Sequence, residues 1–202
     1  HGTQSVANLN DNRLDGDQVT QIKSACPGGH PTVSMLPWTG AGPYPQTYHF
    51  DDPADRDLAT ERKGEQFLKN YENYCEALET EHAIPFAGQY VLGGPLAWMN
   101  RYRGNPDATV VLQGKKVGAI STVLADGGNA VFDLDTMTSS ATRTKPYDME
   151  EIDQYLEGMP FDGYHYEQEL SLLGDKPLPI LRLLQRAYEK AISGWQTAHA
   201  WK

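Results

Sequence analysis

The stretch that decides the fold is His82-Ala-Ile-Pro-Phe-Ala-Gly-Gln-Tyr-Val-Leu-Gly-Gly94. It opens as a short apolar run, passes Pro85 and a tight Phe86-Ala-Gly88 step, and leads into a helical pattern over residues 95–103. This pattern predicts a buried strand that ends in a glycine-bearing loop before a helix. Backbone amides and carbonyls come free of the sheet at such strand ends, and ligands are commonly held there. Every α/β protein also needs glycines at such turns, so the stretch alone does not decide a function.

Two further strand ends precede it in the chain. Residues 3–10 alternate well enough for a strand and are followed by the acidic Asp11. Thr32–Pro37 is typical of a second buried strand, followed by the rigid, Gly- and Pro-rich loop Trp38–Pro45. Because the strand ends of one sheet edge converge in space, we expect Asp11, the start of that loop and Phe86–Gly88 to lie close together.

The remaining periodicity predicts a mainly α/β chain with a helical end. The clearest helix covers about residues 54–80, and its apolar face consists of Phe67, Leu68, Tyr71, Tyr74, Cys75 and Leu78. A short helix is expected near 18–24, strands over 107–113 and 117–124, an exposed Thr/Ser-rich connection over 136–146, and helices over 148–156 and 179–195. We therefore expect an α/β part over residues 1–135 and a mainly helical extension over residues 136–202.

Composition narrows the class of partner. The 202 residues are 39% hydrophobic and 10% aromatic, which is typical of a globular protein. A formal net charge of -10 disfavours sequence-independent binding to nucleic acid or to an anionic membrane. No apolar segment approaches the roughly 20 residues that a spanning helix needs, and the first residues lack the pattern of a signal peptide. A small molecule or another protein is the expected partner.

The two cysteines and the first residues bear on the setting of the chain. Cys26 and Cys75 do not form a CxxC or Cys/His cluster, so a zinc finger or redox motif is disfavoured. They could pair, but a reduced, cytoplasmic protein is the preferred interpretation. The chain opens in a strand-like segment without a Met or helix cap, which suggests a fragment that starts partway through a domain.

Four stretches in order carry a resemblance to a known family: Asn8–Asp11, Trp38–Pro45, Glu61–Lys63 with its helix, and Pro85–Tyr90. Over roughly residues 3–113 the sequence resembles the second half of metallo-β-lactamase-fold proteins. It is most similar to the C-terminal region of CMP-N-acetylneuraminate hydroxylases and, more distantly, to ascorbate-6-phosphate lactonases. The resemblance implies the C-terminal half of an αββα sandwich, followed here by the helical extension.

The same resemblance implies a metal site at one edge of the sheets. The family's first half supplies a His-x-His-x-Asp-His cluster, and no run of that form occurs here, as expected of a chain that lacks that half. The second half supplies an aspartate at a strand end, a position that Asp11 matches; such a carboxylate suits zinc or iron. The lactonase branch places a further His one strand beyond the Pro85 motif, but here residues 109–114 contain none.

Two functions follow from the resemblance. In the first, the chain is part of a metal-dependent hydrolase that acts on a small, sugar- or nucleotide-containing substrate, with Asp11 as a metal ligand. The expected substrate-binding residues are Trp38, Gly40, Phe86, Gly88 and Tyr90. In the second, it is a non-catalytic binding or assembly subunit with a degenerate metal site. The hydroxylase likeness would suggest oxygen chemistry, but the chain shows no ligands for the electron-donating cluster which that requires.

The resemblance also predicts a missing partner. Half of the sandwich would leave the inner sheet face, expected to carry Val6, Leu36 and Ile84, without its covering sheet. We expect that face to be covered by an upstream segment of the same protein or by a second chain.

Overall fold

The computed structural model describes residues 2–10, 12–40, 42–86, 90–113, 118–125, 131–136, 138–163 and 180–199. Its contacts divide the chain into two compact units, residues 1–160 and residues 161–202. Residues 136–160, which the sequence analysis assigned to the extension, belong to the first unit.

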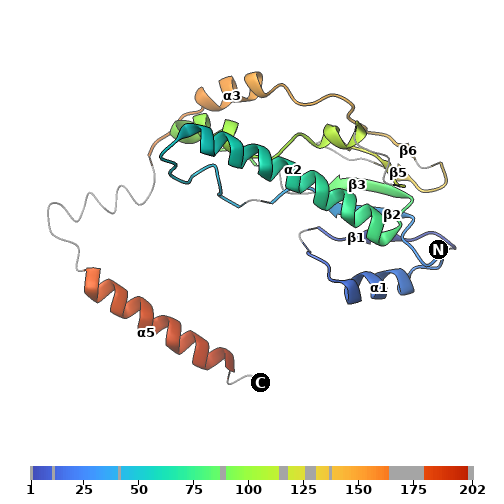
Figure 1. The fold of residues 1–202 in the computed structure, drawn as a ribbon, viewed down its shortest axis with the longest axis horizontal. Helices are drawn as coiled ribbons and strands as arrows, with labels where there is room; N and C mark the ends of the chain where they lie inside the picture. Colours follow the sequence, from blue (N-terminus) through green and yellow to red (C-terminus); the bar gives the residue numbers. More distant parts are fainter. Residues whose placement is uncertain are drawn as a thin grey trace. The chain divides into compact units, whose positions relative to one another are not determined.

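The first unit is α/β and is built on a parallel sheet (Figure 1). The strands β1 (Val6–Asn8), β2 (Val33–Pro37), β3 (His82–Phe86) and β4 (Ile120–Ser121) lie in the order β1-β2-β3-β4. The helices α1 (Gly16–Ala25) and α2 (Pro53–Leu78) connect the first three strands. β2 and β3 confirm the predicted strands over 32–37 and 82–86. Parallel neighbours joined through helices place their carboxyl ends at one edge of the sheet.

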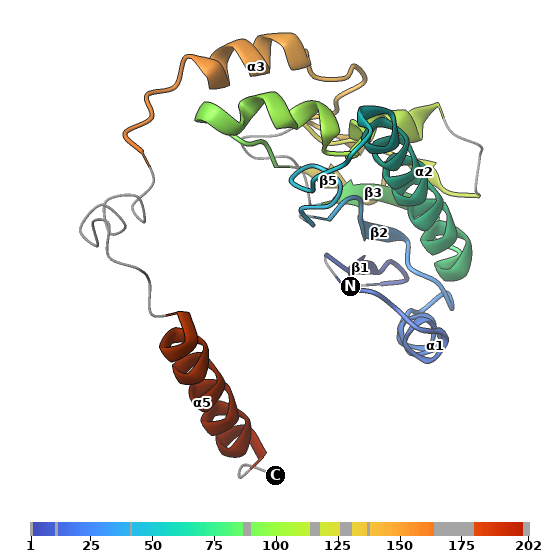
Figure 2. The ribbon, with the colours of Figure 1, turned by 60° about the vertical axis from the view of Figure 1, so that its left-hand side comes forward.

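Both helices pack on the same face of the sheet. Tyr71, Cys75 and Leu78 of α2 are buried against Leu36 and Ala83, and Val19 and Ile22 of α1 pack against the same cluster. The Tyr71 hydroxyl lies 3.0 Å from Ser121 Oγ of β4. The predicted apolar face of the long helix is therefore confirmed at its three innermost positions, and Figure 2 shows α2 beside the strands.

The expected inner face combined residues that lie on opposite faces. Val6 pairs with Val33, which in turn pairs with His82, so these three side chains share one face of the sheet. Leu36 pairs with Pro85 on the other face and is fully buried on the side of α2. Ile84 shares the face of Val6 yet is only 3% exposed, while Val6 is 56% exposed. The grouping of Val6, Leu36 and Ile84 on one uncovered face is wrong, because side chains alternate along a strand.

After β3 the chain forms short elements. η1 (Gly94–Tyr102) and η2 (Ala108–Leu112) are 3-10 helices, β5 (Phe132–Asp133) pairs antiparallel with β6 (Thr138–Ser139), and α3 (Met149–Glu157) follows. The strand predicted over 107–113 is wrong: Asp107 accepts a hydrogen bond from the Thr109 backbone and caps η2 instead. The strand predicted over 117–124 shortens to β4, and the connection predicted over 136–146 contains β6.

The second unit contains α5 (Ile180–His199), close to the helix predicted over 179–195. Its apolar positions Ile180, Leu184, Tyr188 and Ile192 are all exposed.

Candidate functional site

The loops that follow the strands leave the carboxyl edge of the sheet together. The Leu9 backbone N–H donates to the Met35 carbonyl at 3.0 Å, and the Trp38 N–H donates to the Phe86 carbonyl at 3.1 Å. Asn10 turns sharply, with φ +42°, and its N–H donates to the Asn8 side chain at 3.1 Å. A left-handed residue of this type redirects the chain directly after β1.

Tyr90 joins the loop after β3 to the loop after β2. Its hydroxyl donates to Gln46 Oε1 at 2.6 Å and lies 3.4 Å from the Gly42 carbonyl, which also accepts from Lys63 Nζ at 3.1 Å. Burial raises the pKa of Tyr90, so its hydroxyl stays protonated and available as a donor. Two of the three strand-end loops are thus fixed to one another.

Asn100 of η1 holds the same loop from the other side. Its amide donates to the Leu92 carbonyl at 2.9 Å and accepts from the Leu92 N–H at 2.8 Å. This paired contact satisfies both backbone groups of Leu92, and Asn100 is only 4% exposed. Residues 90–92 are therefore anchored through Tyr90 and Leu92.

A pocket opens beside this anchored segment, between it and α3. Its volume is about 270 Å³, and it is lined by Tyr90, Val91, Arg103, Asn105, Asp107, Tyr147, Met149 and Ile152. The Arg103 guanidinium donates to the Tyr90 carbonyl at 2.8 Å and lies 3.6 Å from Met149 Sδ. Burial lowers the pKa of Arg103, an effect partly offset by nearby carboxylates, so the guanidinium stays charged.

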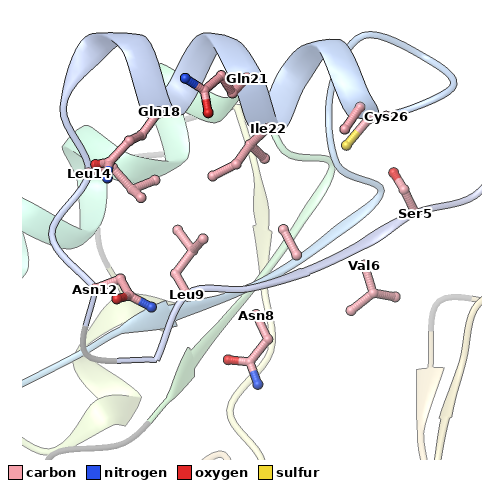
Figure 3. A pocket seen from close by; sticks show the side chains of 12 residues that line it. Ser5, Val6, Asn8, Leu9, Asn12, Leu14, Gln18, Gln21, Ile22 and Cys26 are labelled. Carbon is pink, nitrogen blue, oxygen red and sulfur yellow. The ribbon is translucent and has the colours of Figure 1, made fainter. Parts of the chain in front are cut away.

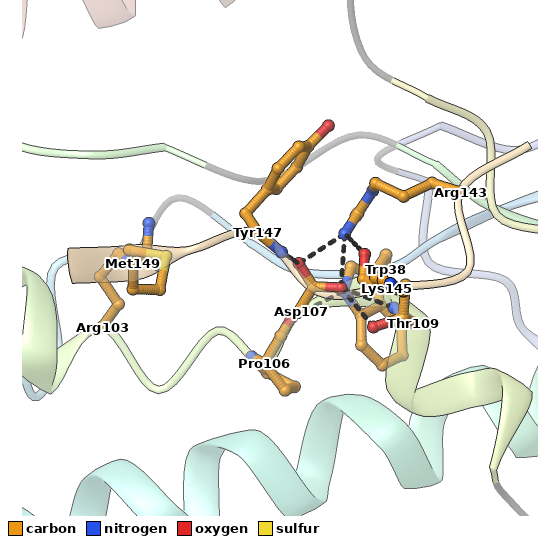
Figure 4. Close-up of polar contacts among 9 residues, drawn as sticks. All are labelled: Trp38, Arg103, Pro106, Asp107, Thr109, Arg143, Lys145, Tyr147 and Met149. Carbon is orange, nitrogen blue, oxygen red and sulfur yellow. Dashed lines mark hydrogen bonds and ion pairs between the residues drawn. The ribbon is translucent and has the colours of Figure 1, made fainter. Parts of the chain in front are cut away.

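Asp107 forms the most densely bonded cluster near this pocket (Figure 4). It accepts from the Thr109 hydroxyl and N–H, from the Tyr147 N–H at 3.2 Å, and from Arg143 Nη1, which lies 2.8 Å from both carboxylate oxygens. Burial alone would raise the pKa of Asp107, but these hydrogen bonds together hold it below its ordinary value. The Arg143 guanidinium also lies 3.9 Å from the centre of the Tyr147 ring. The cluster joins residues 107–109 to residues 143–147.

A larger cavity lies elsewhere, between β1 and α1. It measures about 520 Å³ and is lined by apolar side chains such as Leu9, Leu14 and Ile22 and by uncharged amides such as Asn12 and Gln18 (Figure 3). The figure shows Leu9 pointing toward α1 and Asn8 pointing away from it. No charged side chain lines this groove within the described residues. It therefore provides an apolar and uncharged polar surface, without a charged group for binding or catalysis.

The described members of the predicted site have different surroundings. Trp38 is 2% exposed, donates its indole N–H to the Pro106 carbonyl at 3.0 Å, and packs edge-on against Tyr71. It thus lies in the core. Gly40 lies over the Phe67 ring, Phe86 is half-buried, and Tyr90 lines the pocket. Asp11 and Gly88 lie outside the described residues, so their roles stay predictions.

Arg103, Asp107 and Arg143 were not among the predicted site residues. Arg103 was counted only as part of a helical pattern, and Arg143 fell in a segment expected to be an exposed connection. A signal for Asp107 was present, since Asn105-Pro106-Asp107 before Ala108-Thr109 is typical of a helix start. The apolar Val110-Val111-Leu112 run favoured a strand and concealed it.

Comparisons with known proteins add no relative. No protein-family model matches the chain, and neither a curated protein nor a solved structure matches it. Among the described residues, no group of three or more His, Cys, Asp or Glu side chains could hold a metal ion. In the same part of the chain, no helix is both long and apolar enough to cross a membrane.

Proposed function

We propose that the chain is part of a metal-dependent hydrolase of the metallo-β-lactamase fold, acting on a small sugar- or nucleotide-containing substrate. The observation that supports this is the carboxyl edge of the parallel sheet. The chain turns at Asn10 directly after β1, and the loops after β2 and β3 are joined by Tyr90. Ligands of open parallel sheets bind outside the carboxyl ends of the strands.

The described residues do not by themselves fit a metal centre, because no suitable group of side chains lies among them. In the proposal, Asp11 supplies one carboxylate ligand at the end of β1. The other ligands come from an upstream half of the protein or from a second chain, which also completes the sandwich. When bound, the zinc or iron ion would activate water for hydrolysis. The contribution of this chain is to shape the substrate site with the loops around Tyr90.

The metal content of the full-length natural protein tests this. Wild-type protein and Asp17→Asn, an exposed residue at the start of α1, are expected to hold the same amount of zinc or iron by elemental analysis. Asp11→Asn is expected to lose metal while its circular dichroism spectrum is unchanged. Equal metal in both variants would remove Asp11 from the metal site.

A second candidate is a non-catalytic binding or assembly subunit. The observation that favours it is the segment over residues 109–114, which carries no His. In the structure, η2 turns Ala108, Thr109 and Val111 into the core. This candidate predicts wild-type protein without metal that retains a second polypeptide when its native mass is compared with its denatured mass.

A further inference from the structure

A pocket adjoining the one beside Tyr90 contains two opposite charges that do not satisfy each other. It lies between α2, η1 and α3, has a volume of about 420 Å³, and is lined by Thr60, Glu61, Gly64, Asn100, Arg101, Arg103, Gly104, Asn105, Pro106, Met149 and Asp153. Arg103, Asn105 and Met149 line both pockets. Arg103 is therefore accessible from two adjoining cavities.

Arg103 is held in place, but not all of its N–H groups have a good hydrogen-bond acceptor. One terminal nitrogen donates to the Tyr90 carbonyl, and the other lies 3.6 Å from Met149 Sδ, a weak acceptor. Its Nε is buried and has no hydrogen-bond partner among the described residues. Because Nε is buried, a ligand in the pocket cannot reach it, and the nitrogen beside Met149 is the one that has only a weak acceptor. The site therefore favours an anionic group beside this nitrogen.

Asp153 of α3 carries the opposite charge and is also incompletely hydrogen-bonded. Its Oδ1 is buried and has no donor among the described residues. Its charge acts on Arg103, because it counters the lowering of the Arg103 pKa by burial. Within the described part of the chain, however, the two side chains do not form an ion pair. The site therefore favours a donor, best a cationic one, beside Asp153.

The charges of the whole pocket are balanced. Arg101 and Arg103 supply two positive charges, and Glu61 and Asp153 supply two negative ones. Asp107, on the neighbouring side, already has its counterion in Arg143. A ligand with a large net charge would meet repulsion from one pair or the other, whereas a ligand of zero net charge with separated ends would not. Pro106 and Met149 provide apolar lining.

We propose that this pocket binds a small zwitterion, with its carboxylate on Arg103 and its ammonium group on Asp153. The carboxylate accepts from the guanidinium nitrogen beside Met149, and the ammonium donates to the other oxygen of the Asp153 carboxylate, since Oδ1 is buried. Methylene groups between the two ends contact Met149 and Pro106. This inference goes beyond the proposed hydrolase and does not depend on a metal, so either can fail without the other.

The test uses the full chain and a series of zwitterions of increasing length: glycine, β-alanine, γ-aminobutyrate and ε-aminocaproate. Acetate and methylammonium serve as probes that carry only one of the two charges. Binding is followed by isothermal titration calorimetry and by the NMR signal of isotope-labelled methionine methyl groups, with Met149 assigned by Met149→Leu. One member of the series is expected to bind at least about tenfold more tightly than acetate and to shift the Met149 signal.

The variants separate the two ends of the ligand. Asp153→Asn keeps the shape of the side chain and is expected to weaken the zwitterion by about tenfold while leaving acetate little changed. Arg103→Gln is expected to weaken both the zwitterion and acetate. Arg103→Lys keeps the charge but loses the planar guanidinium, so its affinity for both is expected to lie between those of wild type and Arg103→Gln. Arg62→Gln and Glu150→Gln remove exposed charges on α2 and α3 that do not line the pocket. They are the matched controls and are expected to bind like wild type. Thermal unfolding by circular dichroism verifies that each variant is folded.

Three outcomes would overturn the proposal. No zwitterion binding more tightly than acetate would show that the two charges are satisfied by water alone. Equal loss in Arg62→Gln and Arg103→Gln would place the binding on general surface charge. Binding that leaves the Met149 signal unchanged would place the zwitterion elsewhere on the protein.

Discussion

Replacing Gly104 by alanine is expected to destabilise the first unit by an amount that can be worked from the structure. Gly104 has φ +62°, and a Cβ built there would lie 2.8 Å from the Thr60 carbonyl oxygen and 2.9 Å from the Lys63 side chain. The loop that carries Arg103 thus passes against the backbone of α2 at a distance that only glycine permits. The Thr60 carbonyl lies within α2, so moving it aside would disturb the hydrogen bonds of the helix.

Two terms add and one opposes them. The left-handed conformation costs alanine about 1–2 kcal/mol, and the overlap with α2 resembles overpacking of about 1–3 kcal/mol. The lower entropy of the unfolded alanine chain returns about 0.4–1 kcal/mol. The net expectation is a loss of about 2–4 kcal/mol in the free energy of unfolding, measured by urea denaturation followed by circular dichroism.

Two other glycines serve as controls because they separate strain from overlap. Gly118 also has positive φ, +75°, but a Cβ there would meet nothing within 4 Å, so Gly118→Ala is expected to lose only about 1 kcal/mol. Gly16, at the start of α1, has neither feature and is expected to tolerate alanine. If Gly104→Ala and Gly118→Ala lose the same free energy within about 0.5 kcal/mol, the close approach to α2 does not exist.

The remaining predictions concern the core and the Asp107 cluster. Tyr71→Ala is expected to cost about 3–5 kcal/mol in the free energy of unfolding because the ring is 1% exposed. Tyr71→Phe is expected to cost about 1 kcal/mol for the lost hydroxyl contact. Urea denaturation measures both, and a loss below about 0.5 kcal/mol in the alanine variant would mean that this face of α2 is exposed. Because the folded pKa of Asp107 lies below its ordinary value, its contribution to stability is complete at neutral pH and is lost as the pH falls through that folded value. Asp107→Asn is therefore expected to lower stability at neutral pH and to reduce the loss between neutral pH and about pH 3; an unchanged pH profile of unfolding would show that the bonds from Arg143 do not hold the carboxylate.

The part of the fold that sequence could predict is the part in which local pattern and tertiary packing agree. The helix α2 and the strands β2 and β3 each show a period that matches their burial, and they were placed within a few residues. The segment after Pro106 failed because Val110-Val111-Leu112 is apolar enough for a strand while Asp107 caps a 3-10 helix. Asp107 also bonds Arg143, which lies 36 residues further along the chain, and no local pattern contains that contact.

The same reason explains why the candidate site was found only in part. The sequence indicated the strand ends, because glycines and prolines mark them, and Tyr90 does line a pocket there. It could not indicate the opposite wall, which α3 provides. Met149 of α3 lies against Arg103. Leu156 of α3 is only 6% exposed and packs beside Gly93, where an added Cβ would lie 3.8 Å from the leucine side chain.

The docking of α3 therefore determines whether these pockets exist. Apart from Leu156, α3 is packed through half-buried positions such as Met149, Ile152 and Asp153, so little apolar burial fixes it in place. Asp153 of α3 and Arg103, directly after η1, both line the pocket. A ligand that bridges them would bind only the docked form, and its binding free energy would then stabilise α3 as well as the loop that carries Arg103. Ligand binding and the docking of α3 would then be one equilibrium, because Met149 and Asp153 of α3 line the pocket together with Arg103.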